Sequence, residues 1–187
     1  MRQDQRMAAA LVAHGADANA RLQTWTPTRR SSDDFNFAPE LVGATPLWLA
    51  ARFTEPGVMR VLLEHGADVR FVHHGERVVE GRGEAFVHRT EVTNVLMAAT
   101  GMGGGRAWVP LAGEREPLML ETVRLAADLG VDVNAANADG RTALDAARAL
   151  KYDTVVKFLL ERGARPGTGT AAPPVRGKDS GRSAEPR

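Results

Sequence analysis

The chain has 187 residues, of which 43% are hydrophobic and 25% are charged, which is ordinary for a globular protein large enough to bury a core. It contains no cysteine, which excludes disulfides, thiolate catalysis and cysteine-based zinc sites. The net charge is +1, but residues 165–187 hold five basic and two acidic side chains and so carry +3. The remaining residues therefore carry −2, which excludes a basic surface for nucleic-acid binding there. No apolar run approaches the roughly 18 residues of a membrane span.

The first predicted element is a helix that contains the apolar stretch Met7 to Ala13 and ends before Gly15. The phrase that follows this helix recurs along the chain, as Gly15-Ala16-Asp17, Gly66-Ala67-Asp68, Gly130-Val131-Asp132 and Gly163-Ala164. Each copy follows an apolar helical stretch, and glycine tolerates the left-handed conformation that commonly ends a helix. Internal repetition of this kind predicts a repeat architecture.

A second unit is predicted over residues 43–69 as two short helices. Thr45 offers a hydroxyl cap to the first helix, and Pro46 takes the first helical position, where its missing N–H costs nothing. The side chains that we expect to pack inward are Leu47, Ala50 and Ala51 in the first helix and Val58, Val61, Leu62 and Leu63 in the second.

Two further units are predicted over residues 93–135 and 139–165. The third unit begins at Thr93 and has its second helix over Leu118 to Leu129. The fourth unit opens with the turn dipeptide Asp139-Gly140, followed by a Thr142 cap and a helix to Ala149. Its second helix runs from Tyr152 to Gly163 with one apolar stripe.

This order of motifs resembles the ankyrin repeat, in a bacterial-type form with long loop insertions. The residues that carry the resemblance are Gly43, Thr45-Pro46-Leu47, Ala50-Ala51, Leu62-Leu63, Gly66-Ala67-Asp68, Asp139, Gly140, Thr142, Leu144, Ala146-Ala147, Leu159-Leu160 and Gly163-Ala164. The step of 33 residues from Gly130 to Gly163 matches the family's period as well. Trp48 is a departure, because it stands where the family frequently has a histidine.

The resemblance implies an all-α solenoid of stacked helix–turn–helix units over residues 1–165, with β-hairpin fingers on one side. The units are expected at 1–20, 43–69, 93–135 and 139–165, and the Pro-, Gly- and Arg-rich tail over 166–187 is expected to be disordered. No first helix precedes Met7, which leaves an apolar face uncovered. We therefore expect either that the chain is the C-terminal piece of a longer array or that its start is misplaced.

Three insertions interrupt the regular unit. Relative to the last unit, 18 extra residues lie between Gly15 and Thr45, 15 between Gly66 and Thr93, and 16 between Thr93 and Gly130. Loop-closure entropy rises slowly with length, so the scaffold tolerates such insertions. The second insertion has strand-like stretches on both sides of Gly81-Arg82-Gly83, and we expect a β-hairpin finger with its turn there.

The insertions are where we expect recognition, because they hold six of the ten aromatic residues. Most of these aromatics are expected to pack and hold the loops down, with Trp25, Phe71 and Trp108 exposed as anchors for a partner. The predicted partner-binding residues are Trp25, Arg29, Arg30, Phe71, His73, Arg77, His88, Arg106 and Trp108. The predicted function is a monomeric, non-enzymatic module that binds a protein partner.

Other functions are weaker alternatives on the sequence. A hairpin paired near Glu80-Gly81 would place His73 opposite His88, which suggests a regulatory domain that binds a metal or small ligand, with Glu76 or Glu91 as a further ligand. Nothing fixes the spacing of these side chains, so no metal or cofactor is predicted. The basic tail offers only weak, nonspecific nucleic-acid contact. The glycine-rich run before Arg106 lacks the features of a phosphate loop, and no catalytic residues are predicted.

Overall fold

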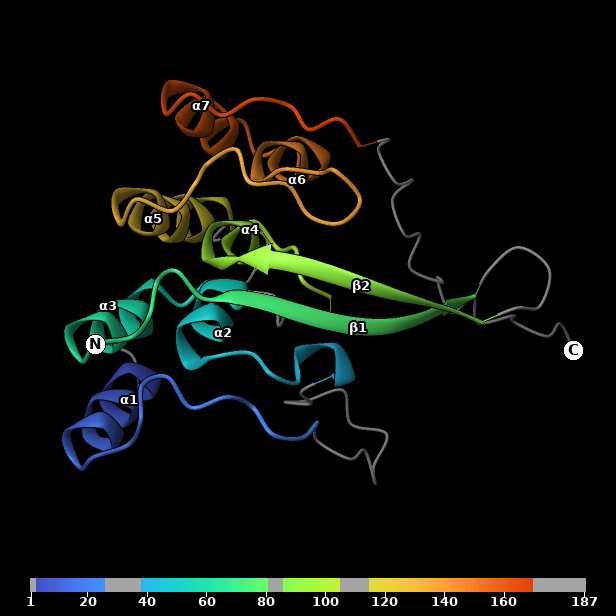
Figure 1. The fold of residues 1–187 in the computed structure, drawn as a ribbon. Coiled ribbons are helices and arrows are strands. Elements are labelled where there is room, and N and C mark those ends of the chain that lie inside the picture. The colour runs from blue at the N-terminus through green and yellow to red at the C-terminus, as the bar shows by residue number, and fades with distance from the viewer. Residues whose placement is uncertain (1–2, 26–37, 81–85, 105–114, 170–187) are drawn as a thin grey trace, which may run out of the picture.

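The structure is a computed structural model that describes residues 3–25, 38–80, 86–104 and 115–169 (Figure 1). Its elements in chain order are α1 (Gln3–Ala13), the 3-10 helix η1 (Pro39–Leu41), α2 (Pro46–Arg52), α3 (Pro56–Glu64), β1 (Val72–Glu80), β2 (Phe86–Asn94), α4 (Val95–Ala99), α5 (Arg115–Asp128), α6 (Ala143–Leu150) and α7 (Asp153–Glu161).

The helices form two stacked layers. The inner helices α2, α4 and α6 pack in a row, and the outer helices α1, α3, α5 and α7 pack in a second row (Figure 1). Each inner helix also packs against the outer helix that follows it in the chain. This arrangement confirms the predicted stack of helix–turn–helix units. The β1–β2 hairpin leaves the stack between α3 and α4 and projects beyond it.

The helix ends follow the repeated glycine phrase. Gly15, Gly66, Gly130 and Gly163 all adopt positive φ, between 77° and 89°, immediately after an outer helix. Only glycine reaches this region without a steric penalty, so the recurring glycine sets the point at which each outer helix ends.

The inner helices begin at side-chain caps. Thr45 accepts a hydrogen bond from the Trp48 backbone N–H, and Thr142 forms a reciprocal capping box with Asp145. In the third unit the cap is Asn94, whose side-chain oxygen lies 2.9 Å from the Met97 backbone nitrogen. Thr93, where the third unit was expected to begin, directly precedes this cap, and both residues also belong to strand β2, which ends at Asn94.

The predicted β-hairpin is confirmed, but its pairing differs from the expected one. The two nine-residue strands are antiparallel, with His73 opposite Thr93 and Val78 opposite His88. The expected pairing of His73 with His88 is therefore wrong. The register is fixed at the base of the hairpin, where His73 and Thr93 are both buried against the helices, rather than by a turn at Glu80. The predicted turn residues lie outside the described residues.

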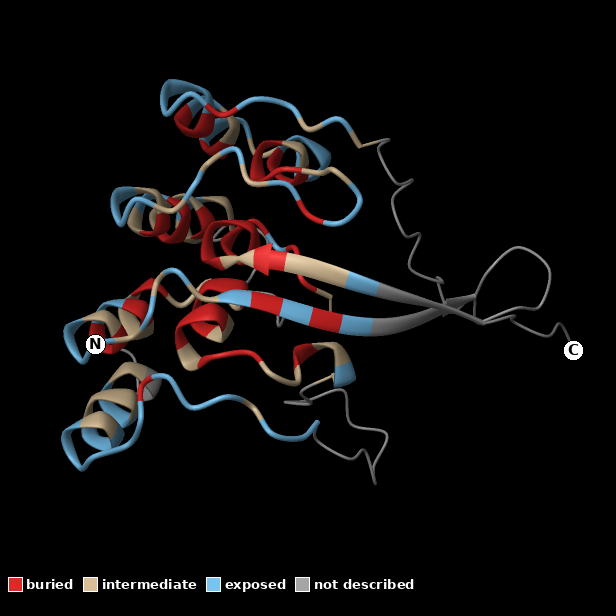
Figure 2. Ribbon diagram, in the orientation of Figure 1, coloured by how far each residue is buried: buried red, intermediate tan, exposed pale blue. Residues whose placement is uncertain are grey.

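The core lies between the two helix layers, as the red segments of Figure 2 show. Trp48 is the largest of its fully buried side chains. Neighbouring units are also joined by side-chain amides that the sequence analysis missed. Asn19 donates to the Gly66 carbonyl at 3.0 Å and accepts from the Asp68 backbone N–H at 2.7 Å. Asn134 bonds the carbonyl of Gly163 and the N–H of Arg165 in the same way.

The ordered chain continues past residue 165, where the tail was expected to begin. The Gly167 N–H donates to the Asp145 carboxylate at 2.8 Å, and the Gly169 N–H donates to the Gly140 carbonyl at 3.0 Å. Residues 166–169 therefore pack on the turn of the last unit. The rest of the predicted tail, 170–187, lies outside the described residues.

Candidate interaction surface

The outward face of the hairpin is exposed near its base. Residues directly opposite each other in an antiparallel pair share a face, and successive residues alternate between faces. Val72, which is 41% exposed, therefore shares a face with the exposed residues His74, Glu76 and Thr90. Arg77 and His88, both predicted to bind a partner, lie farther along the strands, and their side chains are outside the described part of the chain. The base thus presents a mixed apolar and polar surface.

The other face of the hairpin base is buried against helix α2. The His73 ring is 1% exposed and lies 4.4 Å from the Trp48 ring, centroid to centroid, at an interplanar angle of 41°. The Trp48 indole Nε1–H donates to the Thr93 carbonyl at 3.2 Å, so this tryptophan holds both strands at once. The expectation that His73 contacts a partner is corrected here, because its ring lies in the core.

The protonation state of His73 follows from its surroundings. Burial lowers its pKa below the ordinary 6.5, and this outweighs the opposing effect of the Val42 carbonyl. The His73 Nε2 lies 3.1 Å from that carbonyl oxygen, which identifies Nε2 as the protonated, donating nitrogen. The buried Nδ1 has no hydrogen-bond partner. His73 is therefore neutral at pH 7.

The third insertion closes over the same tryptophan. Residues 101–104, which we call the strap, begin the long connection between α4 and α5. Gly103 packs so closely on the Trp48 ring that a Cβ at this position would overlap it. The Gly103 N–H donates to Glu91 of β2 at 3.2 Å, and Arg52 of α2 donates to the Gly104 carbonyl at 2.9 Å. The strap therefore fastens the hairpin to α2.

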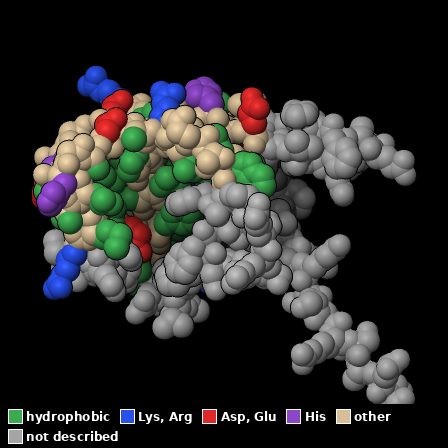
Figure 3. Space-filling model, turned by 90° about the horizontal axis from the view of Figure 1, so that it is seen from below, with side chains coloured by type: hydrophobic (Ala, Val, Ile, Leu, Met, Phe, Trp, Pro, Cys, Tyr) green, Lys and Arg blue, Asp and Glu red, His purple; other side chains and the backbone are tan. Residues whose placement is uncertain are grey.

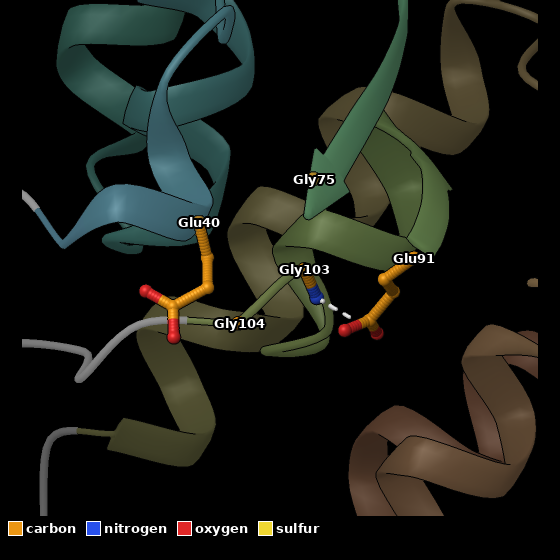
Figure 4. Close-up of a pocket in the computed structure, with 5 residues that line it drawn as sticks. All are labelled: Glu40, Gly75, Glu91, Gly103 and Gly104. Carbon is orange, nitrogen blue, oxygen red and sulfur yellow. Dashed lines mark hydrogen bonds between the residues drawn. The ribbon is translucent and has the colours of Figure 1, made fainter. Parts of the chain in front are cut away.

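A depression at this junction is lined by Glu40, Gly75, Glu91, Gly103 and Gly104 (Figure 4). Figure 4 shows the Glu91 carboxylate turned toward the Gly103 nitrogen, while Glu40 comes from η1 on the opposite side. The depression is too shallow to enclose a ligand. Among the described residues, no three His, Cys, Asp or Glu side chains converge in a way that could hold a metal ion.

The predicted aromatic anchors have different environments. Trp25, at the start of the first insertion, is 43% exposed. Phe71 is half-buried against the core, and the Arg21 guanidinium lies 5.4 Å from its ring centroid, so packing rather than free exposure describes it. The predicted residues Arg29, Arg30, Arg106 and Trp108 lie outside the described residues. No helix in the described part is long and apolar enough to cross a membrane.

Trp48, Arg52 and the strap form one junction that was not predicted from the sequence. The available signal was Trp48 itself, because a large aromatic ring replaces the histidine that the ankyrin motif frequently has there. A buried ring of that size needs covering atoms, and the strap glycines supply them. Every residue of helix α4 and most of α2 are buried, whereas α6 exposes Arg148, Ala149 and Leu150.

Comparison with known protein families agrees with this architecture. The family model of the ankyrin repeat matches residues 42–74 and 139–169. The first match spans α2 and α3 and reaches into β1, and the second spans α6, α7 and the ordered segment after them. Both matches fall on an inner helix followed by an outer helix. Most of the hairpin insertion and the whole connection between α4 and α5 lie between the two matches. The chain therefore contains ankyrin repeats at these two places.

Proposed function

We propose that the protein is a non-enzymatic protein–protein interaction module whose recognition surface is formed by the insertions. Ankyrin repeats are protein-interaction modules, which supports the general function. The observation that carries the proposal is the β1–β2 hairpin, whose strands reach beyond the stack while its base is locked to Trp48 (Figure 1). A projecting element with a buried base can contact a partner without disturbing the scaffold.

The side chains that we propose as contacts are aromatic or basic. Trp25 is exposed and large, and such residues contribute most to interface energies when a partner buries them. The other proposed contacts come from the first insertion, the distal hairpin and the third insertion: Arg29, Arg30, Arg77, His88, Arg106 and Trp108. Arginine suits this role because its guanidinium forms paired hydrogen bonds and stacks on aromatic rings.

The rigid base matters for affinity. A binding element that is already held in one orientation loses less conformational entropy when it binds. Trp48 bonds the Thr93 carbonyl, and the strap bonds Glu91, so both contacts act on strand β2. We propose that this junction orients the hairpin for its partner.

A shortened hairpin tests the proposal. Residues 78–88 are replaced by Asn-Gly, which leaves Arg77 and Arg89 as the last strand pair and closes them with a favoured two-residue turn. The contacts of Trp48 and His73 are untouched, so we expect the melting temperature to stay within a few degrees. Partners that co-purify with the intact chain should be lost, as quantified by mass spectrometry.

The matched control is a chain that lacks residues 170–187 and keeps the hairpin intact. It should retain the same partners as the full chain. If the shortened hairpin retains them and the tail deletion loses them, recognition does not lie in the finger and the proposal is wrong.

The alternative of a metal- or ligand-binding regulatory domain is not favoured by the geometry. His73, its central residue, is engaged by the Val42 carbonyl and the Trp48 ring. His88 lies opposite Val78, five residue pairs along the hairpin from His73.

A further inference from the structure

Among the histidines whose side chains are described, His73 is the buried one. His14, His65 and His74 are exposed, and Figure 3 shows histidine side chains at the surface of the molecule. A proton taken up by an exposed ring leaves the charge in water, whereas a proton on His73 places the charge among the aromatic rings of the core. Protonation can therefore change the structure at this position.

The two ring nitrogens of His73 have different surroundings. Nε2 lies 3.1 Å from the Val42 carbonyl oxygen and donates its N–H to it. Nδ1 is buried and has no hydrogen-bond partner. A further proton must therefore add to Nδ1, which creates a buried N–H donor without an acceptor as well as a buried charge. Both are costly, so the closed junction opposes the protonated ring.

Charged and titratable side chains approach this junction from the elements around the ring: Arg52 of α2, Glu40 of η1, Glu91 of β2, His74 of β1 and Arg21, which stacks on Phe71. The strap contributes none. Glu91 and the face of Trp48 favour a cation at His73, but the Glu91 carboxylate also faces the Arg52 cation. Burial has the largest effect, and it lowers the pKa of His73.

Strand β1 is held to the stack at His73. The ring lies 4.4 Å from the Trp48 ring and bonds the Val42 carbonyl, and the adjacent Gly75 packs closely on the backbone of η1. Strand β2 is held separately, through the bond from the Trp48 indole N–H to the Thr93 carbonyl. Because the two strands are paired along their whole length, a displacement of β1 at its base also acts on this bond.

We infer that His73 is a proton-operated latch: when its ring takes up a proton, the base of the hairpin separates from Trp48 and Val42 while the helices stay stacked. The imidazolium then lies in water instead of the core. The last unit is not affected over the same pH range, because hydrogen bonds keep the pKa of its capping residue Asp145 below 3.8. This inference goes beyond the proposed function and does not depend on any partner.

The size of the effect follows from linkage. In the open junction the ring is hydrated and has an ordinary pKa of about 6.5, whereas the closed junction excludes the proton. Below pH 6.5 the ratio of open to closed molecules should therefore rise about tenfold for each pH unit, which amounts to about 30-fold between pH 7.5 and pH 5.

Hydrogen exchange of the Trp48 indole N–H, followed by NMR on the full chain, tests the latch. This N–H joins α2 to the hairpin, so its protection factor should fall about 30-fold from pH 7.5 to pH 5. Low concentrations of urea should not change its exchange, because a local opening exposes little surface. The comparison probe is the Met59 amide, bonded to the Glu55 carbonyl at 3.0 Å, whose exchange requires α3 to unfold and should accelerate with urea.

Two results for the unchanged chain would overturn the inference. One is a Trp48 protection factor that is equal at the two pH values. The other is a Trp48 exchange that depends on urea as strongly as that of Met59, because the hairpin would then separate only when the helices unfold. Both results are obtained without any substitution, so the test does not rely on a variant that folds.

A pair of variants identifies the titrating group. His73→Gln keeps an N–H for the Val42 carbonyl but does not titrate, so the Trp48 protection factor should change less than twofold between pH 7.5 and pH 5. The matched control is His74→Gln, which alters the exposed neighbour and should keep the 30-fold fall. A fall that is lost in His74→Gln and retained in His73→Gln would show that His73 is not the latch.

Discussion

The last unit and the unit of α2 and α3, which the hairpin follows, have the same pair of helices but different supports. In the last unit the supports are nearer in the sequence: Thr142 and Asp145 cap α6 across three residues, and Gly167 adds to the same carboxylate across 22 positions. In the unit of α2 and α3 the supports come from distant parts of the chain. Arg52 bonds Gly104 across 52 positions, and Trp48 bonds Thr93 across 45.

The difference shows how an ankyrin stack accommodates long insertions. An inserted loop costs little closure entropy, but it gains a fixed orientation only if some of its residues pack on the scaffold. Here Trp48 provides the packing surface, and the hairpin and the strap meet on it. Stability of the middle of the stack should therefore depend on this junction, while the last unit should depend on its caps.

The largest effect is expected from Trp48→Ala. Removing a fully buried tryptophan leaves a cavity and the lost hydrogen bond to Thr93, and typically lowers the free energy of unfolding by about 3–5 kcal/mol. The comparison variant is Trp25→Ala, which removes a 43% exposed ring and should lower it by less than about 1 kcal/mol. Urea denaturation measures both. Equal losses would show that the junction is not the special support described here.

A smaller loss is expected from Gly103→Ala, because the added Cβ overlaps the Trp48 ring and the backbone has φ of +104°. Overpacking together with backbone strain predicts about 2–4 kcal/mol. Gly101→Ala in the same strap has a similarly positive φ but open space around its Cβ, so only the backbone penalty of about 1–2 kcal/mol applies. Two variants of equal stability would contradict the packing of the strap on Trp48.

The two regions should also lose stability at different pH. The pKa of His73 in the folded chain lies below 6.5. As pH falls through 6.5, the unfolded chain therefore takes up a proton that the folded chain does not, and the free energy of unfolding drops.

For Asp145, burial raises the pKa, but the hydrogen bonds from Thr142 and Gly167 outweigh this effect and lower the pKa below 3.8. Its contribution is present above pH 3.8 and is lost as pH falls further. Chemical denaturation at several pH values checks this: His73→Gln should remove the drop in stability just below pH 6.5 and keep the loss below pH 3.8. A slope near pH 6.5 that is unchanged by the substitution would contradict the assignment.

The smallest effect concerns the amide links between units. Asn19 and Asn134 each bond the glycine phrase of the next unit, whereas Arg70 stands at the equivalent position between them. Arg70→Asn should add a similar link to Gly130 and raise the free energy of unfolding by about 0.5–1.5 kcal/mol. The reverse change, Asn134→Arg, should lower it by a similar amount. Thermal melts compare the two variants with the unchanged chain. If both substitutions shift the melting temperature in the same direction, the link is contradicted.

The sequence predicted what depends on local chemistry. The repeated glycines located the ends of the outer helices, and Thr45 and Thr142 located two of the three caps, because both rules need only neighbouring residues. The finger was also predicted from its strand-like stretches and turn residues.

The junction could not be predicted in the same way. The burial of His73 depends on Trp48, which precedes it by 25 residues, and the tight packing around Trp48 depends on glycines in another insertion. The alternation of faces along a strand tells which residues share a side, but not which side meets a helix. For that reason His73 was assigned to the partner surface, whereas its neighbour His74 is the exposed histidine.

Site-specific photo-crosslinking shows directly where on the molecule a partner protein binds. A photoreactive amino acid replaces Glu76, exposed on the hairpin, in one chain and Lys157, exposed on outer helix α7, in another. We expect a covalent adduct with a partner protein from position 76 and none from position 157. Adducts from position 157 alone would contradict it, because recognition would then lie on the helices of the stack.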